Sequence, residues 1–518
     1  MHPLPDDATP SEQRAGSLML LVLAFFSLGL MLLLRHEMWQ DEWQAWLIAM
    51  ESPSLPDLFR NLRYEGHPGL WHLGLFLVSR ITSSPLAMQL LHLLVATGAV
   101  YVFLKCSPFT RIEKILFIFG YFPLYEYAVI SRNYAPGVLG LFSFCAFFCM
   151  PPRNFLLLAV ILFLLCQTSV YGLMMALVLG VILLRGAAQD RASWTWKAIA
   201  ALVILLLGIG LSLIQIVPPA DSGFAVGWRF DAELPHLMET LAAVWKSYVP
   251  LPAPDYHFWG TNILSDCRWQ SLLSVVLLVF GLLLFIRQPV PLFLYAVGTA
   301  GILAFTHVKY SGSLRHHGHL FLLLIAGLWL SSAYPRKKNF CWFIQGLSDF
   351  CWKNRPRVIL VLLAAQLAAG LTAASLDLFF PFSASKDAAR FIRQHQLDRM
   401  LILGHRDDAA SAVAGCLGRP LYYPASQGWG TFVIWNRKRE PELEPGELLR
   451  QAEKLSRQHQ EEALLLVNYR LSPGEFPLIL IQQFTNSLVP EENYYLYLVP
   501  HPCPGNMGKW QTEAPRRR

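Results

Sequence analysis

The chain has 518 residues, of which 54% are hydrophobic and only 15% are charged, and its formal net charge is +7. Soluble enzymes carry about a quarter of charged residues, so this composition excludes an ordinary soluble enzyme and predicts an integral membrane protein. The Lys and Arg residues fall in short loops between apolar runs and form no basic patch of the kind that binds nucleic acid.

Apolar runs that are nearly free of charge follow one another through residues 18–376. About 20 apolar residues cross about 30 Å of hydrocarbon as a helix, so the runs predict about eleven transmembrane helices. The first run follows an acidic leader and precedes no small-residue cleavage site, so we expect a retained helix and not a secretory signal. The predicted spans cover residues 18–34, 86–104, 115–130, 139–150, two within 155–184 that turn at 167–172, 198–217, 271–286, 292–305, 320–330 and 358–376.

The short basic loops also predict which side of the membrane each segment faces. Basic loops lie in the cytoplasm under the positive-inside rule, and about eleven spans then place the N-terminal tail, residues 1–17, inside as well. Two long loops rich in Trp, Tyr and Pro, residues 36–85 and 218–270, would face outward. Residues 377–518 would follow them on the outer side, and long ordered loops of this kind often carry function.

Residues 377–518 change to the alternation of strands and helices that is typical of a small, doubly wound α/β domain. The turn Gly404–Asp408 lacks the Gly-rich dinucleotide fingerprint, so we assign it no cofactor. The nine Cys residues show no zinc spacing, and a disulfide among Cys267, Cys416 and Cys503 stays open. We expect helices at 385–394, 409–417 and 445–459, and strands at 399–404, 421–423, 432–435, 463–468, 477–482 and 494–499.

Two adjacent carboxylates, Asp41 and Glu42, follow the first predicted span and lie among Trp residues. Asp41 is interpreted either as the N-terminal cap of an amphipathic helix that continues over residues 44–50 or as a catalytic group. Spacing alone favours the cap. The same loop ends with Glu65 and His67, where His67 is either exposed in a turn or a ligand contact.

A third set, Glu126, Arg132 and Tyr134, lies in a short outer link between two predicted spans. A charged residue in the middle of a bilayer costs about 2.5–3.5 kcal/mol. Glu126 and Arg132 would therefore either neutralise each other or contact an ionic ligand. Both alternatives stay open at this point.

A fourth set, Lys309, Arg315 and His316, belongs to a segment rich in cationic and protonatable groups between two spans. Arg offers a bidentate fork and Lys a point charge, so this segment suits a phosphate. The alternative is that Lys309 and Arg315 meet lipid headgroups. His316 and its neighbours His317 and His319 show no metal-ligand pattern, so we predict no metal site.

Together the four sets resemble the GT-C fold of glycosyltransferases that use a polyprenyl-phosphate sugar, such as protein O-mannosyltransferases and lipid A aminoarabinose transferases. Those proteins carry an acidic pair after the first helix, a His-Pro-(Pro)-Leu element before the second and an Arg-x-Tyr element further on. The matching residues here are Asp41-Glu42, His67-Pro68-Gly69-Leu70 with Gly69 in place of the second Pro, and Arg132-Asn133-Tyr134. The resemblance covers residues 18–376.

The resemblance implies an inverting transfer from a polyprenyl-phosphate-linked sugar to a glycan, lipid or protein acceptor, at the outer face of a bacterial inner membrane. Asp41 would be the general base on the acceptor hydroxyl, and Glu42 would orient Asp41 or the acceptor. Cationic side chains would neutralise the leaving phosphate, so no cofactor is required, and a divalent metal stays open. The groups expected to bind the donor phosphate or to line the site are Glu65, His67, Glu126, Arg132, Tyr134, Lys309, Arg315 and His316.

Two other classes of protein stay open. A polytopic transporter or lipid flippase would place its ionisable residues near the middle of the membrane, and it would often show inverted repeats. A non-enzymatic assembly or sensor protein would use the C-terminal domain as its binding module and leave the four sets scattered.

Overall fold

The computed structural model describes residues 10–189, 196–223, 227–337, 342–440, 443–471 and 478–500. Contacts within the chain divide it into two compact units. The helical unit consists of residues 1–36 and 48–380, and the α/β unit consists of residues 37–47 and 381–518. The chain is therefore mostly helical and carries a small sheet in its C-terminal region.

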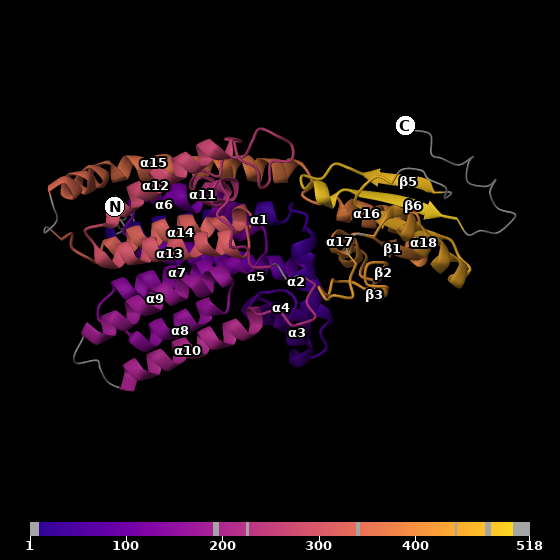
Figure 1. Cartoon of the computed structure of the whole chain (residues 1–518), viewed down its shortest axis with the longest axis horizontal. Helices are drawn as coiled ribbons and strands as arrows, with labels where there is room; N and C mark the ends of the chain where they lie inside the picture. The colour runs from indigo at the N-terminus through magenta and orange to yellow at the C-terminus, as the bar shows by residue number, and fades with distance from the viewer. Residues whose placement is uncertain are drawn as a thin grey trace, which may run out of the picture. The chain divides into compact units, whose positions relative to one another are not determined.

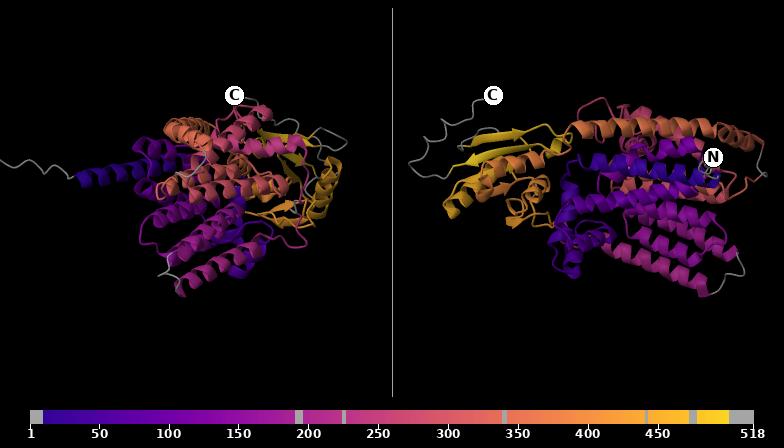
Figure 2. Two further views of the ribbon diagram at one scale, coloured as in Figure 1. Left: turned by 60° about the vertical axis from the view of Figure 1, so that its left-hand side comes forward. Right: turned by 180° about the vertical axis from the view of Figure 1, so that it is seen from behind.

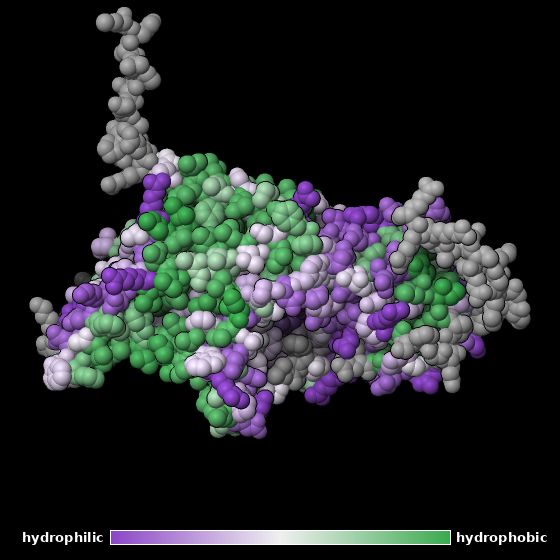
Figure 3. Space-filling view, turned by 90° about the horizontal axis from the view of Figure 1, so that it is seen from above, coloured by the Kyte–Doolittle hydropathy of each residue, from purple (hydrophilic) through white to green (hydrophobic). Residues whose placement is uncertain are grey.

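Seven helices of the helical unit are long and apolar enough to cross a membrane. They run side by side in several views (Figures 1 and 2). Apolar residues cover a broad face of this unit (Figure 3), which indicates a membrane protein. The seven are α1 (Pro10–Leu33), α5 (Leu86–Cys106), α9 (Val170–Gln189), α10 (Trp196–Ile216), α12 (Cys267–Phe285), α13 (Pro289–Val308) and α15 (Trp342–Phe379).

The remaining helices of the N-terminal 380 residues are shorter, and the count of about eleven spans stays a prediction. A turn separates α8 from α9 as predicted, but it covers residues 167–169 and not 167–172, because α9 begins at Val170. Every residue of α14 except Arg315 is buried, so this helix lies inside the unit. The shorter elements are α2 (Gln40–Glu51), α3 (Leu55–Leu62), α4 (Leu70–Ser79), α6 (Arg111–Ile118), the π-helix η1 (Tyr121–Val129), α7 (Tyr134–Cys149), α8 (Phe155–Cys166), α11 (Leu234–Tyr248) and α14 (Leu314–Ser331).

The predicted span at residues 115–130 is not one helix but two elements, α6 and η1, with a break at Gly120. A Cβ atom at Gly120 would lie 3.1 Å from Cβ of Gln366, and one at Gly370 would lie 2.9 Å from the Phe119 carbonyl oxygen. The two glycines therefore allow α15 to pack closely against the break, and η1 behind it is entirely buried.

The α/β unit contains a six-stranded sheet of order β3-β2-β1-β4-β6-β5. Strands β2, β1 and β4 are parallel, and the other neighbours pair antiparallel, so the sheet is mixed. The strands are β1 (Leu401–Gly404), β2 (Leu421–Tyr423), β3 (Gly428–Gly430), β4 (Ala463–Val467), β5 (Ile479–Phe484) and β6 (Tyr494–Val499). The helices are α16 (Ser385–Gln394), the 3-10 turn η2 (Leu397–Arg399), α17 (Asp407–Leu417), α18 (Pro445–His459) and the 3-10 turn η3 (Pro490–Glu492).

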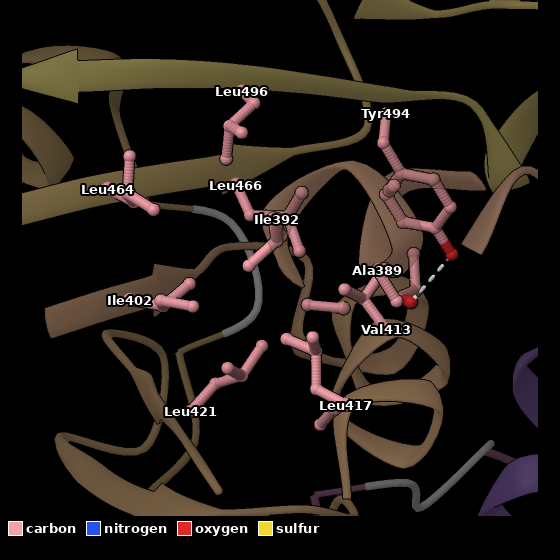
Figure 4. Close-up of a cluster of buried hydrophobic side chains, with 14 of the residues drawn as sticks. Ala389, Ile392, Ile402, Val413, Leu417, Leu421, Leu464, Leu466, Tyr494 and Leu496 are labelled. Carbon is pink, nitrogen blue, oxygen red and sulfur yellow. Dashed lines mark hydrogen bonds between the residues drawn. The ribbon is translucent and has the colours of Figure 1, made fainter. Parts of the chain in front are cut away.

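Two hydrophobic cores flank this sheet, as a doubly wound arrangement requires. One core packs α16 and α17 against side chains such as Ile402 and Leu464 (Figure 4), and the other packs α18 against Leu403 and Leu465. In the first core, the Tyr494 hydroxyl donates a hydrogen bond of 2.8 Å to the Ala409 carbonyl (Figure 4).

The strand predicted at residues 432–435 is wrong, because β3 forms at Gly428–Gly430 instead. The backbone of Val433 pairs with a side chain: its N–H donates to Gln44 Oε1 at 2.9 Å and its carbonyl accepts from Gln44 Nε2 at 2.7 Å. Cys267 and Cys416 are free thiols, and Cys503 lies outside the described residues.

Candidate functional site

The acidic pair Asp41-Glu42 lies in the first turn of α2, in the part of this helix that belongs to the α/β unit. Glu42 is fully buried, and its carboxylate accepts the Trp39 N–H at 3.3 Å while its own N–H donates to the Trp39 carbonyl at 3.0 Å. These reciprocal bonds show Glu42 capping the start of the helix. Asp41 is half-buried beside it.

Several aromatic and amide contacts fix this first part of α2 within the α/β unit. Trp43 packs against Gly415 of α17 so closely that a Cβ atom there would collide with the indole ring. The Trp39 ring meets Phe382 edge to face, with centroids 6.5 Å apart. With the two bonds of Gln44 described above, these contacts make residues 37–47 part of the α/β core.

A further carboxyl group next to this turn, that of Glu492, was not among the residues predicted from the sequence pattern. Its side chain is fully buried, and its Oε1 accepts the Gln40 N–H at 3.0 Å. Ser383 and Tyr494 hydroxyls lie 2.6 Å and 2.9 Å from its Oε2. Burial raises the pKa of Glu492 to about 7, against the lowering effect of these hydrogen bonds, and the charge of Asp41 raises it further.

In the helical unit, Glu126 is buried in η1 and is the centre of a polar cluster. Its Oε2 accepts hydrogen bonds from the Tyr121 hydroxyl at 2.8 Å and from Trp259 Nε1 at 3.3 Å. Arg315 and, more weakly, Arg132 interact electrostatically with this carboxylate. Glu126 therefore has two hydrogen-bonded neighbours in addition to Arg132, the only partner that the sequence suggested.

The backbone at Arg132 is held by His92, a buried residue of α5. His92 Nδ1 lies 3.2 Å from the Ala128 carbonyl, and His92 Nε2 accepts the Arg132 N–H at 3.3 Å. Because a carbonyl can only accept, Nδ1 carries the ring hydrogen. His92 thus joins the end of η1 to the residue that precedes the start of α7.

Tyr134 and His316, both predicted site residues, meet inside the helical unit. Their rings contact edge to face with centroids 5.8 Å apart. Tyr134 also meets His319, which stacks on Tyr171 at 4.8 Å. The two helix starts, at α7 and α14, therefore lie next to each other.

The N-terminus of α14 explains the roles of its histidines. His316 Nδ1 accepts the N–H of Ser313 at 2.8 Å, so this ring caps the helix. His317 Nε2 and His319 Nδ1 each lie 2.9 Å from a backbone carbonyl, of Ser311 and of His316 respectively. The three rings have separate backbone partners and do not form a joint ligand set.

Arg315 follows the first residue of the same helix. Its guanidinium lies 5.5 Å from the centroid of the Trp259 ring, and its carbonyl accepts the Tyr127 hydroxyl at 2.7 Å. Trp259 belongs to the long aromatic loop at residues 218–270. The aromatic content and length of that loop were the signals that could have pointed to it.

His67 precedes α4 and interacts electrostatically with His72 and with His316. Two residues later, the Gly69 N–H donates to Gln215 Oε1 at 2.8 Å, and a Cβ atom at Gly69 would lie 2.7 Å from Phe59 Cε1. A second Pro at this position would lose the N–H and collide with Phe59. The departure from the family pattern therefore has a packing reason.

Two predicted residues lie at the margins of this cluster. Lys309 ends α13, and its ammonium lies 4.9 Å from the exposed ring of Trp228. Glu65 lies half-buried in the turn after α3, where its N–H donates to the Leu62 carbonyl at 3.0 Å.

Asp231, His236 and His307 form the only group among the described residues whose ligand atoms lie close enough for a metal, within 4.8 Å of one another. Each histidine lies 2.8 Å from a carbonyl through Nε2, and the two rings stack with centroids 4.3 Å apart and an angle of 29°. A metal lies in the plane of each imidazole that binds it. Stacked rings do not direct their lone pairs at one ion, so this arrangement does not fit a shared metal.

In the α/β unit, the turn after β1 leads into α17, whose first turn carries Asp407 and Asp408. Arg439 donates to both oxygens of the buried Asp407, at 3.0 Å and 2.9 Å from its Nε. Two carboxylates and their Arg partner thus occupy the helix end where the phosphates of a dinucleotide would bind.

The predicted residues therefore divide between the two units. The helical unit brings together His67, Glu126, Arg132, Tyr134, Arg315 and His316, whereas Asp41 and Glu42 belong to the α/β unit. The clustered cations lie at or near the starts of α4, α7 and α14, where backbone N–H groups also favour an anion. No family model, curated protein or solved structure matches the chain.

Proposed function

We propose that the protein is an integral membrane glycosyltransferase that moves a sugar from a polyprenyl-phosphate donor to an acceptor hydroxyl on the extracytoplasmic face of a bacterial inner membrane. The single observation that carries the proposal is the polar cluster around Glu126, in which Arg132, Arg315 and His67 gather at three helix starts. Two guanidinium groups together with helix starts suit a phosphate better than a neutral sugar. The GT-C-like arrangement with about eleven spans belongs to the same proposal.

The reaction assigns different steps to different residues. Asp41 takes the proton from the acceptor hydroxyl as the oxygen attacks the sugar C1. The bond between C1 and the phosphate oxygen breaks, and polyprenyl phosphate leaves with the electron pair. Arg132 and Arg315 stabilise its negative charge, with Lys309 contributing from the margin. Glu42, which caps α2, holds the turn that carries Asp41.

The location of the charges within their helices supports an enzyme more than a transporter. In α14, Arg315 and three histidines lie in the first six residues, and the rest of the helix is apolar up to Ser331. Arg132 likewise precedes α7. Charges at helix ends suit interfacial chemistry, whereas a transporter concentrates them near the middle of the membrane.

Mass spectrometry of glycans and lipids from cells with and without the gene tests the reaction class. Cells without it are complemented with the wild type, with Asp41→Asn, or with Asp57→Asn as the control, since Asp57 pairs with the exposed Arg60 on α3. We expect one glycoconjugate to be lost, and to return with the wild type and Asp57→Asn but not with Asp41→Asn. An unchanged set of glycoconjugates contradicts the reaction class, and full rescue by Asp41→Asn contradicts the role of Asp41.

A further inference from the structure

Besides the contacts of Trp39, Trp43 and Gln44, the first turn of α2 is held within the α/β unit by a buried carboxyl group, that of Glu492. This group accepts the N–H of Gln40, the residue directly before Asp41, and its other oxygen contacts Ser383 and Tyr494. We propose that Glu492 is a positioning residue for Asp41, because it fixes the turn that carries this carboxylate to the C-terminal sheet. This assignment of Glu492 rests on the proposed function, in which Asp41 is the general base.

The backbone around Glu492 is itself well anchored. The Glu492 carbonyl accepts the Ala384 N–H at 3.1 Å, and the preceding residues Leu488 and Val489 donate to the carbonyls of Pro381 and Phe382 at 2.8 Å and 3.3 Å. This ladder joins the segment before α16 to the segment before β6. The backbone that carries the Glu492 side chain is therefore held by hydrogen bonds, so the position of its carboxyl group relative to the first turn of α2 is well defined.

The hydroxyl of Tyr494 shows how the anchor depends on a proton. It has one hydrogen but two acceptors in range, the Ala409 carbonyl at 2.8 Å and Glu492 Oε2 at 2.9 Å. A protonated Glu492 can donate to the Tyr494 hydroxyl, which leaves the Tyr494 hydrogen for the Ala409 carbonyl. An ionised Glu492 only accepts, from Ser383 and from Tyr494, and a Tyr494 hydrogen that turns to Glu492 gives up the bond to α17.

Burial is the main cause that favours the protonated form of Glu492. The charge of Asp41 on α2 favours the same form more weakly, because two ionised carboxylates repel each other. With the pKa of Glu492 at about 7, the group changes its charge in the neutral range. Asp41 on α2, Tyr494 on β6 and Cys416 on α17 interact electrostatically with Glu492, and Glu37 before α2 and Lys386 on α16 interact with Cys416.

Hydrogen exchange of the full chain in lipid nanodiscs, read by mass spectrometry, tests this inference without any substrate. Exchange of the amides in residues 37–47 is compared between about pH 5.5 and about pH 8.5, after correction for the intrinsic rates. Glu492→Gln keeps an oxygen acceptor for Gln40 but cannot ionise. Glu492→Ala removes the anchor, and Glu491→Gln changes the exposed neighbouring carboxylate as the control.

In the wild type we expect the corrected exchange of residues 37–47 to rise about tenfold towards the higher pH. Glu492→Gln should abolish this rise, Glu492→Ala should give fast exchange at both pH values, and Glu491→Gln should behave as the wild type. Strand β4 reports on the whole unit and should stay protected in wild type, Glu492→Gln and Glu491→Gln, which separates local positioning from unfolding.

The inference would be overturned if residues 37–47 of Glu492→Ala exchanged as slowly as those of the wild type. It would also be overturned if exchange in Glu492→Gln kept the wild-type dependence on pH. If Glu492→Ala also increases exchange in β4, that variant unfolds the unit. The pH dependence of exchange in Glu492→Gln then decides whether Glu492 positions the turn. The result is independent of the proposed function: transfer by Asp41→Asn would refute the catalytic role and leave the exchange data unchanged. Conversely, Asp41→Asn could lose sugar transfer while Glu492→Gln keeps the wild-type pH dependence of exchange. That result would refute the positioning role of Glu492 and leave the catalytic role of Asp41 standing.

Discussion

Two buried carboxyl groups, one in each unit of the molecule, have charged neighbours of opposite kinds. In the helical unit the Glu126 carboxylate lies among cations of opposite sign, chiefly Arg315, and among hydroxyl and indole donors. In the α/β unit the Glu492 carboxyl lies beside Asp41, which has the same sign. A neighbouring opposite charge favours the ionised form of a carboxyl group, whereas burial and, more weakly, a neighbouring like charge favour the protonated form of Glu492. The first arrangement suits the binding of an anion, and the second suits the movement of a proton.

The largest effect on stability and sugar transfer is expected from the removal of Arg315, because this change takes away the cation that distinguishes the surroundings of Glu126 from those of Glu492. In Arg315→Ala the buried Glu126 loses its main cation, which destabilises the helical unit by about 3–5 kcal/mol. Complementation measured as above should show sugar transfer reduced about 10²-fold to 10³-fold. Arg60→Ala, which breaks an exposed pair, serves as the control.

The double variant Arg315→Ala/Glu126→Gln separates folding from binding. It removes the uncompensated charge, so expression and folding should recover while transfer stays low. Recovery of transfer in the double variant would mean that Arg315 only neutralises Glu126.

The burial of Glu492, with a smaller contribution from the charge of Asp41, predicts a dependence of stability on pH in the α/β unit. The folded protein binds a proton at Glu492 up to a pH of about 7, whereas the unfolded chain releases it near its ordinary value of 4.5. The free energy of unfolding should therefore fall by about 3 kcal/mol as pH rises between these two values. Urea titration of the full chain, with proteolysis of residues 381–500 as the readout, measures this fall. Glu492→Gln should flatten the curve, and a wild-type slope in that variant would exclude Glu492 as the cause.

Gly415 allows the indole of Trp43 to approach α17, so a methyl group there should loosen α2. Gly415→Ala should cost about 1–3 kcal/mol and increase hydrogen exchange in residues 37–47. Gly446→Ala is the matched control, because a Cβ atom at Gly446 meets no other atom within 4 Å. Equal exchange in the two variants would show that α2 does not depend on this contact.

The smallest effect is expected for Gln44→Ala. This change leaves the N–H and the carbonyl of Val433 without their partner, at a cost of about 1–2 kcal/mol in the α/β unit. Urea titration as above measures the loss, with the exposed Gln458→Ala as the control. A loss equal to that of the control would mean that water replaces both bonds.

The sequence predicted those features that depend on local pattern. Charge-free runs identified the long helices, and hydrophobic periodicity placed α16, α18, β2 and β6 at their observed bounds. The same kind of run at residues 115–130 predicted one transmembrane span, and it held no sign of the break at Gly120. That break depends on the close approach of Gly370, which lies far away in the chain.

The candidate site was predictable where charge stands out from an apolar background, as at Glu126, Arg132 and Arg315. It was not predictable where the partner is distant in sequence. Gln40 and Glu492 are 452 positions apart, and the sequence around Glu492 predicted only the strand at residues 494–499 that follows it. Gln44 and Val433 are likewise 389 positions apart, and the Gln44 side chain bonds the backbone groups of Val433 that a neighbouring strand would otherwise bond.

Binding of a polyprenyl phosphate to the purified full chain, measured by native mass spectrometry, tests most directly whether the cluster around Glu126 is a lipid-phosphate site. We predict that the wild type, Asp41→Asn and Arg60→Ala bind the lipid phosphate with equal affinity, because these changes lie outside the cluster. Arg315→Ala/Glu126→Gln, which folds without the buried charge, should bind at least about tenfold more weakly. Wild-type affinity in that double variant would contradict the account.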